Sequence, residues 1–131
     1  MKGGFHIFSV EILVISMISR EQMVRTDPVV EDAISRYISR VREIFGESIC
    51  QVLLFGSYAR GEAGPESDID LLVITTDPGW DTEYRLITMG YQIFSETGVM
   101  LSVKVRTTGE FDRAGNVSFL RNVKQEGVLV G

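Results

Sequence analysis

Cysteine and histidine are almost absent from this chain, and their scarcity excludes several kinds of site. Cys50 is the single cysteine and His6 the single histidine. One thiol can form neither a disulfide within the chain nor a zinc site built from cysteines. One histidine far from any recognisable motif gives no support to a histidine-dependent mechanism. Cys50 stands among apolar residues, which predicts a small buried side chain, and a free thiol fits a reducing cytoplasm.

A hydrophobic run long enough to cross a membrane is also missing. The most apolar segment, Phe5–Ile18, has fourteen residues interrupted by polar side chains, whereas a membrane span needs about 20. The segment shows no small-residue cleavage site, which argues against a secretory signal. We expect residues 1–25 to be an N-terminal arm that is poorly ordered, is buried in an oligomer contact, or lies upstream of a true start at Met17 or Met23. Residues 26–131 are then the expected folded domain.

Positive charge is in deficit as well. The 131 residues include 13 Lys and Arg against 18 Asp and Glu, which gives a net charge of −5 and a pI near 4.9. Proteins that bind DNA or RNA broadly usually present a basic face, and this composition does not predict one. The length suggests one domain, and the hydrophobic fraction of 44% is ordinary for a globular protein.

Apolar periodicity and turn residues divide the chain into helices and strands. Asp27 and Pro28 mark a helix start, and apolar residues recur at spacings of three and four as far as Gly46. The expected helices are 28–45, 80–97 and 116–126, with single turns at 57–60 and 110–111, and the expected strands are 49–55, 68–75, 99–106 and a terminal extended piece at 127–130. The apolar side of the helix 80–97 is expected to carry Tyr84, Ile87, Tyr91, Ile93 and Phe94. This order predicts an α/β fold with a small mixed β-sheet and packed helices.

Two short motifs point to chemistry. Gly56 and Ser57 leave the first expected strand, and Asp68 and Asp70 open the second. Because side chains alternate along a strand, Asp68 and Asp70 are expected on one face, where they repel each other unless a cation lies between them. Mg²⁺ is usually held by one or two carboxylates together with phosphates. Glycine lets a phosphate approach the backbone, serine offers a hydroxyl and an N–H, and Arg60 either contacts phosphate or pairs with a carboxylate.

Each motif is common by itself, but their combination is specific. A Gly-Ser dipeptide is usually a simple turn, and Asp-x-Asp is usually a solvated strand face. Here an apolar strand, Gly-Ser, Arg-Gly, a short spacer and Ser-Asp-x-Asp before a second apolar strand follow one another. The reaction that fits is nucleotidyl transfer, in which a hydroxyl attacks the α-phosphorus of a nucleoside triphosphate and pyrophosphate leaves.

The segment Gly56-Ser57-Tyr58-Ala59-Arg60-Gly61, followed by Ser67-Asp68-Ile69-Asp70-Leu71-Leu72-Val73, resembles the signature of the DNA polymerase β-like nucleotidyltransferase superfamily. The short length resembles its minimal nucleotidyltransferase branch, and the resemblance covers residues 27–131. It implies that Gly56 and Ser57 bind the triphosphate and that Asp68 and Asp70 ligate Mg²⁺, with Mn²⁺ as a substitute.

The same resemblance implies a donor and a partner. Members of this branch are often antitoxins of a small helical HEPN-type protein, and some transfer AMP from ATP to a tyrosine of that toxin. The implied function is therefore Mg²⁺-dependent transfer of AMP to a protein or small-molecule hydroxyl, in the cytoplasm. The implied assembly is a homodimer or a hetero-complex with a HEPN-type protein.

Ser102 departs from the superfamily pattern. Active members generally carry a third carboxylate at the position that aligns with Ser102, and serine replaces one metal ligand and the candidate general base with a neutral hydroxyl. Lys104, on the same strand face, could replace a metal's charge or simply reach solvent. Glu110 and Asp112 follow the strand, and either could swing back as a substitute acid.

Three hypotheses therefore remain open from the sequence. The first is an active nucleotidyltransferase, the second a nucleotide-binding or partner-binding module that has lost turnover, and the third a structural subunit. The pair Asp68 and Asp70 favours the first, and Ser102 favours the other two.

Overall fold

A mixed four-stranded sheet lies at the centre of the described chain in the computed structural model, which covers residues 27–64, 67–77, 79–113 and 118–131. β1 runs antiparallel to β2 and β4, whereas β2 and β3 are parallel. The strands are β1 (Ile49–Phe55), β2 (Ile69–Thr75), β3 (Leu101–Thr107) and β4 (Val128–Leu129), in the order β3-β2-β1-β4. The predicted α/β fold with a small mixed sheet is confirmed. The expectations for residues 1–25, His6 among them, concern residues outside this description.

Two long helices, α3 (Pro28–Phe45) and α5 (Trp80–Thr97), have the bounds that the sequence predicts. The Asp27 carboxylate accepts a hydrogen bond from the Val29 N–H at 2.9 Å, and Pro28 occupies the first turn, where a missing N–H costs nothing. Gly98 ends α5 in the left-handed conformation that glycine adopts without strain. The shorter described helices are η1 (Gly46–Ser48), α4 (Gly56–Ala59), α6 (Thr108–Asp112) and α7 (Ser118–Glu126). None of the helices described is long and apolar enough to cross a membrane.

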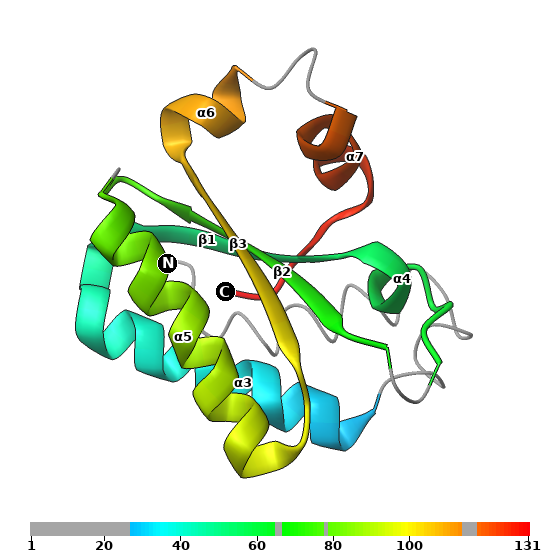
Figure 1. Cartoon of the computed structure of the whole chain (residues 1–131). Coiled ribbons are helices and arrows are strands. Elements are labelled where there is room, and N and C mark those ends of the chain that lie inside the picture. Colours follow the sequence, from blue (N-terminus) through cyan, green and yellow to red (C-terminus); the bar gives the residue numbers. More distant parts are fainter. Residues whose placement is uncertain (1–26, 65–66, 78, 114–117) are drawn as a thin grey trace.

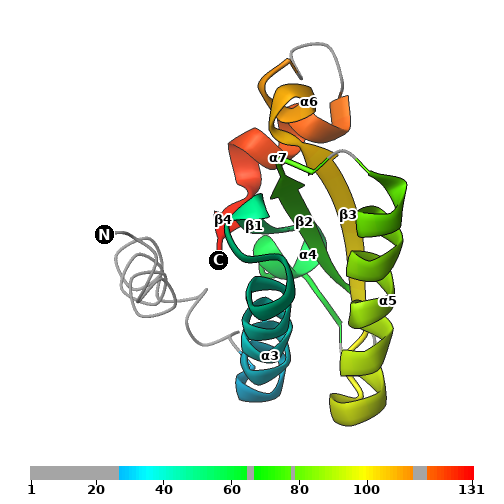
Figure 2. The ribbon, with the colours of Figure 1, turned by 90° about the vertical axis from the view of Figure 1, so that its left-hand side faces the viewer.

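The helices cover the two faces of the sheet unequally (Figures 1 and 2). α3 and α5 lie side by side against one face, and the short helix α7 packs on the other. Alternation along the strands sets this division, because Leu101, Val103 and Val105 of β3 face the larger core while Ser102 and Lys104 face the opposite side. The predicted two-faced character of this strand is confirmed.

Side-chain hydrogen bonds of Tyr37, Arg40 and Arg36 join α3 to α5. The Tyr37 hydroxyl, buried in the larger core, donates a hydrogen bond to the Leu86 carbonyl at 2.8 Å, and burial raises the pKa of Tyr37. One turn further along α3, the Arg40 guanidinium donates to both carboxylate oxygens of Glu96, near the end of α5, at 2.6 Å. Arg36 also donates to Glu96, at 3.3 Å. The bidentate contact holds the pKa of Glu96 below its usual range. The two helices therefore form one layer that supports β2 and β3.

Cys50 is exposed, so the prediction of a buried thiol was wrong. The pairing of β1 with β2 is irregular here, because Ile49 opposes Thr75 while Gln51 opposes the next residue, Ile74. The extra residue of such a bulge interrupts the alternation that would bury every second side chain. The irregularity depends on the partner strand, and a run of apolar letters does not reveal it.

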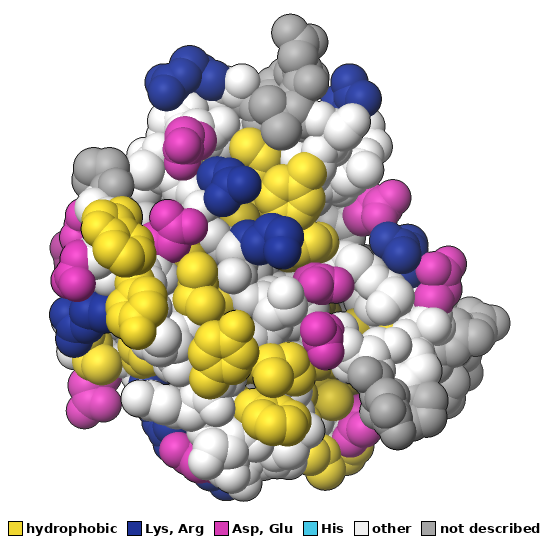
Figure 3. All heavy atoms as spheres, in the orientation of Figure 1, with side chains coloured by type: hydrophobic (Ala, Val, Ile, Leu, Met, Phe, Trp, Pro, Cys, Tyr) yellow, Lys and Arg dark blue, Asp and Glu magenta, His cyan; other side chains and the backbone are white. Residues whose placement is uncertain are grey.

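The predicted apolar side of α5 was also wrong in part. Tyr84, Tyr91 and Phe94 are 55%, 57% and 45% exposed. The side chains that α5 buries are Thr82, Leu86, Met89, Gly90 and Ile93. The helix thus carries two apolar stripes, and the sequence pattern does not say which of them faces the sheet. Figure 3 shows the hydrophobic side chains that gather on the outer surface over α5 and the start of β3.

Candidate functional site

The turn between β1 and α4 brings Gly56 against Asp70. β1 ends at Phe55, which opposes Asp70 in the antiparallel pair β1–β2, and the chain then turns with a φ of 79° at Gly56. A Cβ atom at this position would fall on a carboxylate oxygen of Asp70. Only glycine fits both the backbone conformation and the space. The two sequence motifs, separated by more than ten residues in the chain, therefore form one site.

Asp68 immediately precedes β2 and is exposed, whereas Asp70 is the second residue of β2 and is half-buried. Burial raises the pKa of Asp70, the Lys104 ammonium opposes that rise, the Asp68 carboxylate adds to it, and Arg60 opposes it weakly. The predicted neighbourhood of the two carboxylates is present, because the Asp68 charge contributes to the raised pKa of Asp70. An ionised pair here is favoured by a cation between the two groups.

The donor set suits Mg²⁺ when phosphate oxygens complete it. Mg²⁺ takes oxygen ligands and is commonly bound by one or two carboxylates plus substrate phosphates. Asp68 and Asp70 supply the carboxylates, and Gly56, which has no side chain, lets the Asp70 carboxylate lie against the turn. Within the described residues no group of three acidic, histidine or cysteine side chains is close enough to hold a metal ion. A metal here would therefore depend on its nucleotide for further ligands.

Ser102 lies directly beside Asp70 across the parallel pair β2–β3. A third carboxylate at this position would adjoin the first two, so the alignment that selected Ser102 agrees with the register. Glu110 does not substitute for it, because its carboxylate accepts the Thr107 N–H at 2.8 Å and caps α6. Asp112 belongs to the same short helix and joins no acidic cluster in the described residues.

Lys104 is exposed, and its ammonium lowers the pKa of Asp70 more than the Arg60 guanidinium does. Arg60 is also exposed and pairs with Glu62 at 3.0 Å and with Glu126 of α7 at 3.5 Å. The carboxylate pairing considered for Arg60 is thus present, and its contact with phosphate stays a prediction. Both cations border the site on the α7 side of the sheet.

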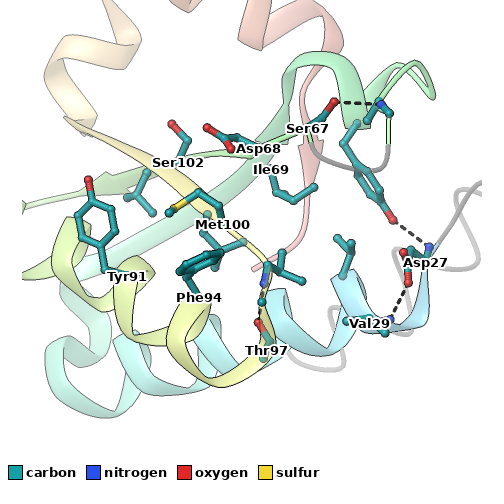
Figure 4. A pocket seen from close by; sticks show the side chains of 18 of the residues that line it. Asp27, Val29, Ser67, Asp68, Ile69, Tyr91, Phe94, Thr97, Met100 and Ser102 are labelled. Atoms are coloured by element: carbon teal, nitrogen blue, oxygen red, sulfur yellow. Dashed lines mark hydrogen bonds between the residues drawn. The ribbon is translucent and has the colours of Figure 1, made fainter.

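A cavity of about 1120 Å³ opens on the other side of Asp68 (Figure 4). Asp68 and Ser102 lie at one edge of it, Tyr91, Phe94 and Met100 along one wall, and Val29 and Asp27 at the far end. Gly56, Ser57 and Asp70 do not line it. The sequence analysis placed Tyr91 and Phe94 on the apolar side of the helix without saying which side faces the sheet. The spacing of residues 80, 84, 87, 91 and 94, alternately four and three, is the signal that could have revealed this second, outward stripe.

Comparison with known proteins identifies the family of this chain. The family model for the nucleotidyltransferase domain matches residues 34–130. Three proteins of Methanocaldococcus jannaschii, each named "putative protein adenylyltransferase", are similar. One is 35% identical over 97 residues, which cover 74% of this chain and 93% of the relative. Another is 25% identical over 100 residues, covering 76% and 96%, and a third is 38% identical over 48 residues, covering 37% and 33%.

One solved structure, a nucleotidyltransferase-like protein of Sulfolobus solfataricus, matches with a TM-score of 0.40 and 18% identity, covering 98% of this chain and 89% of that one. The family assignment rests on the domain model and on the 35% identical relative. Together with the glycine turn against the aspartate pair, they show that this chain belongs to the nucleotidyltransferase domain family, within the DNA polymerase β-like superfamily.

Proposed function

We propose that this chain is a Mg²⁺-dependent nucleotidyltransferase that moves AMP from ATP to a hydroxyl group of a protein. The observation that carries the proposal is the close approach of Gly56 to Asp70, which joins the Gly-Ser turn to the carboxylate pair. The adenylyl group and the protein acceptor are supported by the names of the relatives. A small-molecule hydroxyl is the alternative acceptor.

Each residue of the site has a distinct task in this reaction. Gly56 lets the β- and γ-phosphates approach the backbone, and Ser57 donates its hydroxyl and N–H to them. Asp68 and Asp70 would hold Mg²⁺, or Mn²⁺ in its place, between themselves and the phosphates. When bound, the metal supplies polarisation of the α-phosphate and a lower pKa for the attacking hydroxyl. Arg60 and Lys104 contribute positive charge where the pyrophosphate leaves.

A second candidate is a nucleotide-binding module without turnover. Ser102 favours it, because the position beside Asp70 carries a neutral hydroxyl and no third acid lies close by in the described residues. Such a chain would bind ATP with Mg²⁺ through the same residues and transfer AMP slowly or not at all.

The partner implied by the family resemblance is part of the proposal. We suggest that the chain acts in the cytoplasm as an antitoxin, paired with a small helical HEPN-type protein whose hydroxyl receives AMP. Exposed aromatic side chains on α5 support an association with another protein, as a hetero-complex or a homodimer.

A transfer assay tests the proposal. The full chain is incubated with ATP labelled at the α-phosphate, Mg²⁺ and the product of the neighbouring gene. Label should appear on that protein and fall by at least about 100-fold in Asp70→Asn, because a lost charge in a catalytic site commonly costs this much. Asp112→Asn is the matched control, since Asp112 is an exposed acid away from the site.

The outcomes separate the candidates. Tight binding of ATP and Mg²⁺ without transfer would favour the module. A chain that binds no nucleotide but holds the helical protein firmly would favour a structural subunit and would sink the enzyme proposal.

A further inference from the structure

The outer surface of α5 carries an apolar stripe that the other described elements leave exposed. Its members recur at spacings of four and three, which places them along one side of a helix. Trp80, Tyr84, Tyr91 and Phe94 are 75%, 55%, 57% and 45% exposed, and Ile87 lies half-buried between them. Trp80 and Tyr84 stack edge to face with ring centroids 5.9 Å apart. At a rise of 1.5 Å per residue the stripe runs about 21 Å along the helix.

The stripe leads into the cavity beside Asp68. Ile87, Tyr91 and Phe94 belong to both, and the cavity continues from them past Met100 to Ser102 and Asp68 (Figure 4). An apolar track of this length exceeds what a small acceptor needs. With about 1120 Å³, the cavity itself is also larger than most small-molecule sites, which usually measure about 300–1,000 Å³. The dimensions therefore suit a macromolecule that reaches the carboxylates with one side chain.

The geometry of phosphoryl transfer indicates that the acceptor, and not the pyrophosphate, occupies the cavity. The attacking and leaving oxygens lie roughly in line on opposite sides of the phosphorus. The proposed cradle for the leaving pyrophosphate, Gly56 and Ser57, lies outside the cavity, whereas Asp68 borders it. The attacking hydroxyl must come from the side away from that cradle. The cavity, which borders Asp68 and Ser102 but not Gly56 or Ser57, offers the acceptor such an approach.

The charged residues of the cavity and of the stripe's far end indicate which class of acceptor binds there. None of the residues that line the cavity in the described chain is Lys or Arg, and Asp27 and Asp68 are its charged members. At the far end of the stripe, the first turn of α5 adds Asp81 and Glu83. Figure 3 shows acidic side chains bordering the hydrophobic surface. Acidic ends repel a nucleic acid and favour a peptide with basic residues around an apolar centre.

We propose that the cavity and the α5 stripe form the docking site for a protein acceptor whose hydroxyl lies in an apolar segment flanked by basic residues. This inference rests on the proposed function. The acceptor oxygen forms a bond to the α-phosphorus of ATP, and the bond between that phosphorus and the bridging oxygen of pyrophosphate breaks. The pyrophosphate leaves with the electron pair, and the hydroxyl proton passes to water. Tyr91 and Phe94 position the acceptor and touch no reacting atom.

Synthetic peptides of about eleven residues provide the probe, because such a chain, extended at about 3.3 Å per residue, spans the stripe and the cavity. In one set a central Tyr, Ser or Thr is flanked by Leu and Phe with Arg at both ends, and in the matched set Asp replaces Arg. Neither set contains tryptophan, so Trp80, the single tryptophan of the chain, reports binding at the stripe by its emission. Transfer is followed with ATP labelled at the α-phosphate and Mg²⁺.

The Arg-ended peptides should shift the Trp80 emission to shorter wavelength and accept label, and the Asp-ended peptides should do neither. The double variant Tyr91→Ala with Phe94→Ala should lose about tenfold or more in peptide affinity and in kcat/KM for the peptide, the loss expected for interface anchors. Its affinity for ATP with Mg²⁺ should stay within twofold of the parent. Ile44→Ala is the matched control, since Ile44 is 51% exposed on α3 and does not line the cavity.

Two results would overturn the docking site. One is equal peptide binding by the parent and the double variant, and the other is no shift of Trp80 emission with any Arg-ended peptide. Because that emission needs no ATP, it decides the matter even if the chain fails to bind nucleotide. Failure to bind ATP would remove the proposed function alone. Peptide binding lost in the double variant, with ATP bound but no label transferred, would support docking on the module.

Discussion

Gly56 is the residue on which the proposed nucleotide site depends most directly. Its φ of 79° disfavours any other residue, and a Cβ would strike the Asp70 carboxylate. We expect Gly56→Ala to weaken ATP binding by at least about tenfold, because Asp70 must move, and to cost about 1–2 kcal/mol of stability from the left-handed backbone. Gly46→Ala is the control, since Gly46 also has a positive φ but has open space around its Cβ. Calorimetric titration and thermal unfolding measure both effects, and equal losses of ATP affinity in the two variants would contradict the role of Gly56.

Asp70 should make the folded chain less stable at neutral pH than a neutral side chain would. Burial raises the folded-state pKa of Asp70 above its unfolded value. The stability is therefore fully present below the unfolded pKa and is lost as the pH rises through the folded pKa. Asp70→Asn escapes that loss, so the variant should melt at a higher temperature than the parent at pH 7, with the difference vanishing towards pH 3. Melting curves at both pH values, without metal, check the sign, and a variant less stable at pH 7 would refute it.

At the level of single residues, the sequence indicated which residues lie close together at the candidate site better than it indicated which side chains are exposed. Alternation along a strand suffices to place Asp68 and Asp70 together, and the Gly-Ser turn is recognisable by its letters. The prediction that Cys50 is buried was wrong because a bulge depends on pairing with another strand. The sequence grouped Tyr91 and Phe94 with the buried Ile93, because a helix with two apolar stripes gives no local sign of which one the sheet covers.

At the level of elements, α5 packs on β3 through Gly90. A Cβ there would lie 2.9 Å from the Leu101 carbonyl oxygen and 3.3 Å from a methyl group of Val103. Gly90→Ala gains about 1 kcal/mol of helix propensity but overpacks the interface at a cost of about 1–3 kcal/mol. Because the contact is with backbone, which cannot swing aside, we expect a net loss of about 1 kcal/mol in the free energy of unfolding. Ser95→Ala, at an exposed position of α5, should be neutral or stabilising in the same urea titration, and a stabilised Gly90→Ala variant would show that the helix can shift.

Element bounds were predictable wherever a cap residue marks them. Local hydrogen bonding and backbone conformation set the bounds of α3 at Asp27 and Pro28 and the end of α5 at Gly98. The residue types at these positions predict both effects. The order of the strands in the sheet was not predictable in this way, because β4 pairs with β1 over only two residues near the end of the chain. That pairing depends on contacts distant in sequence, which periodicity does not report.

At the scale of the whole molecule, the described cations are mostly engaged with the chain's own acids and rings. Arg40 pairs with Glu96, and Arg60 pairs with Glu62 and Glu126. Three further cations lie over aromatic rings, which are the pairs Arg85 on Phe45, Arg106 on Phe119 and Lys124 on Phe111. A cation held against an acid or a ring contributes less to binding a phosphate backbone than a free one. Within the described part of the chain, the positive charge is thus mostly held in such local pairs.

We therefore expect the full chain to bind neither single-stranded DNA nor RNA at physiological salt. Its net charge of −5 repels a polyphosphate at long range, and non-specific nucleic-acid binders, which rely on many free cations, reach a Kd of about 10⁻⁴–10⁻⁶ M under these conditions. Fluorescence anisotropy with labelled oligonucleotides should show a Kd weaker than about 100 μM. ATP with Mg²⁺ should still bind in the same buffer, since the glycine turn and the carboxylate pair recognise it locally. An oligonucleotide Kd in the low micromolar range that weakens steeply with added salt would mean that the cations gather into a usable face, and would reopen a nucleic-acid acceptor for the cavity.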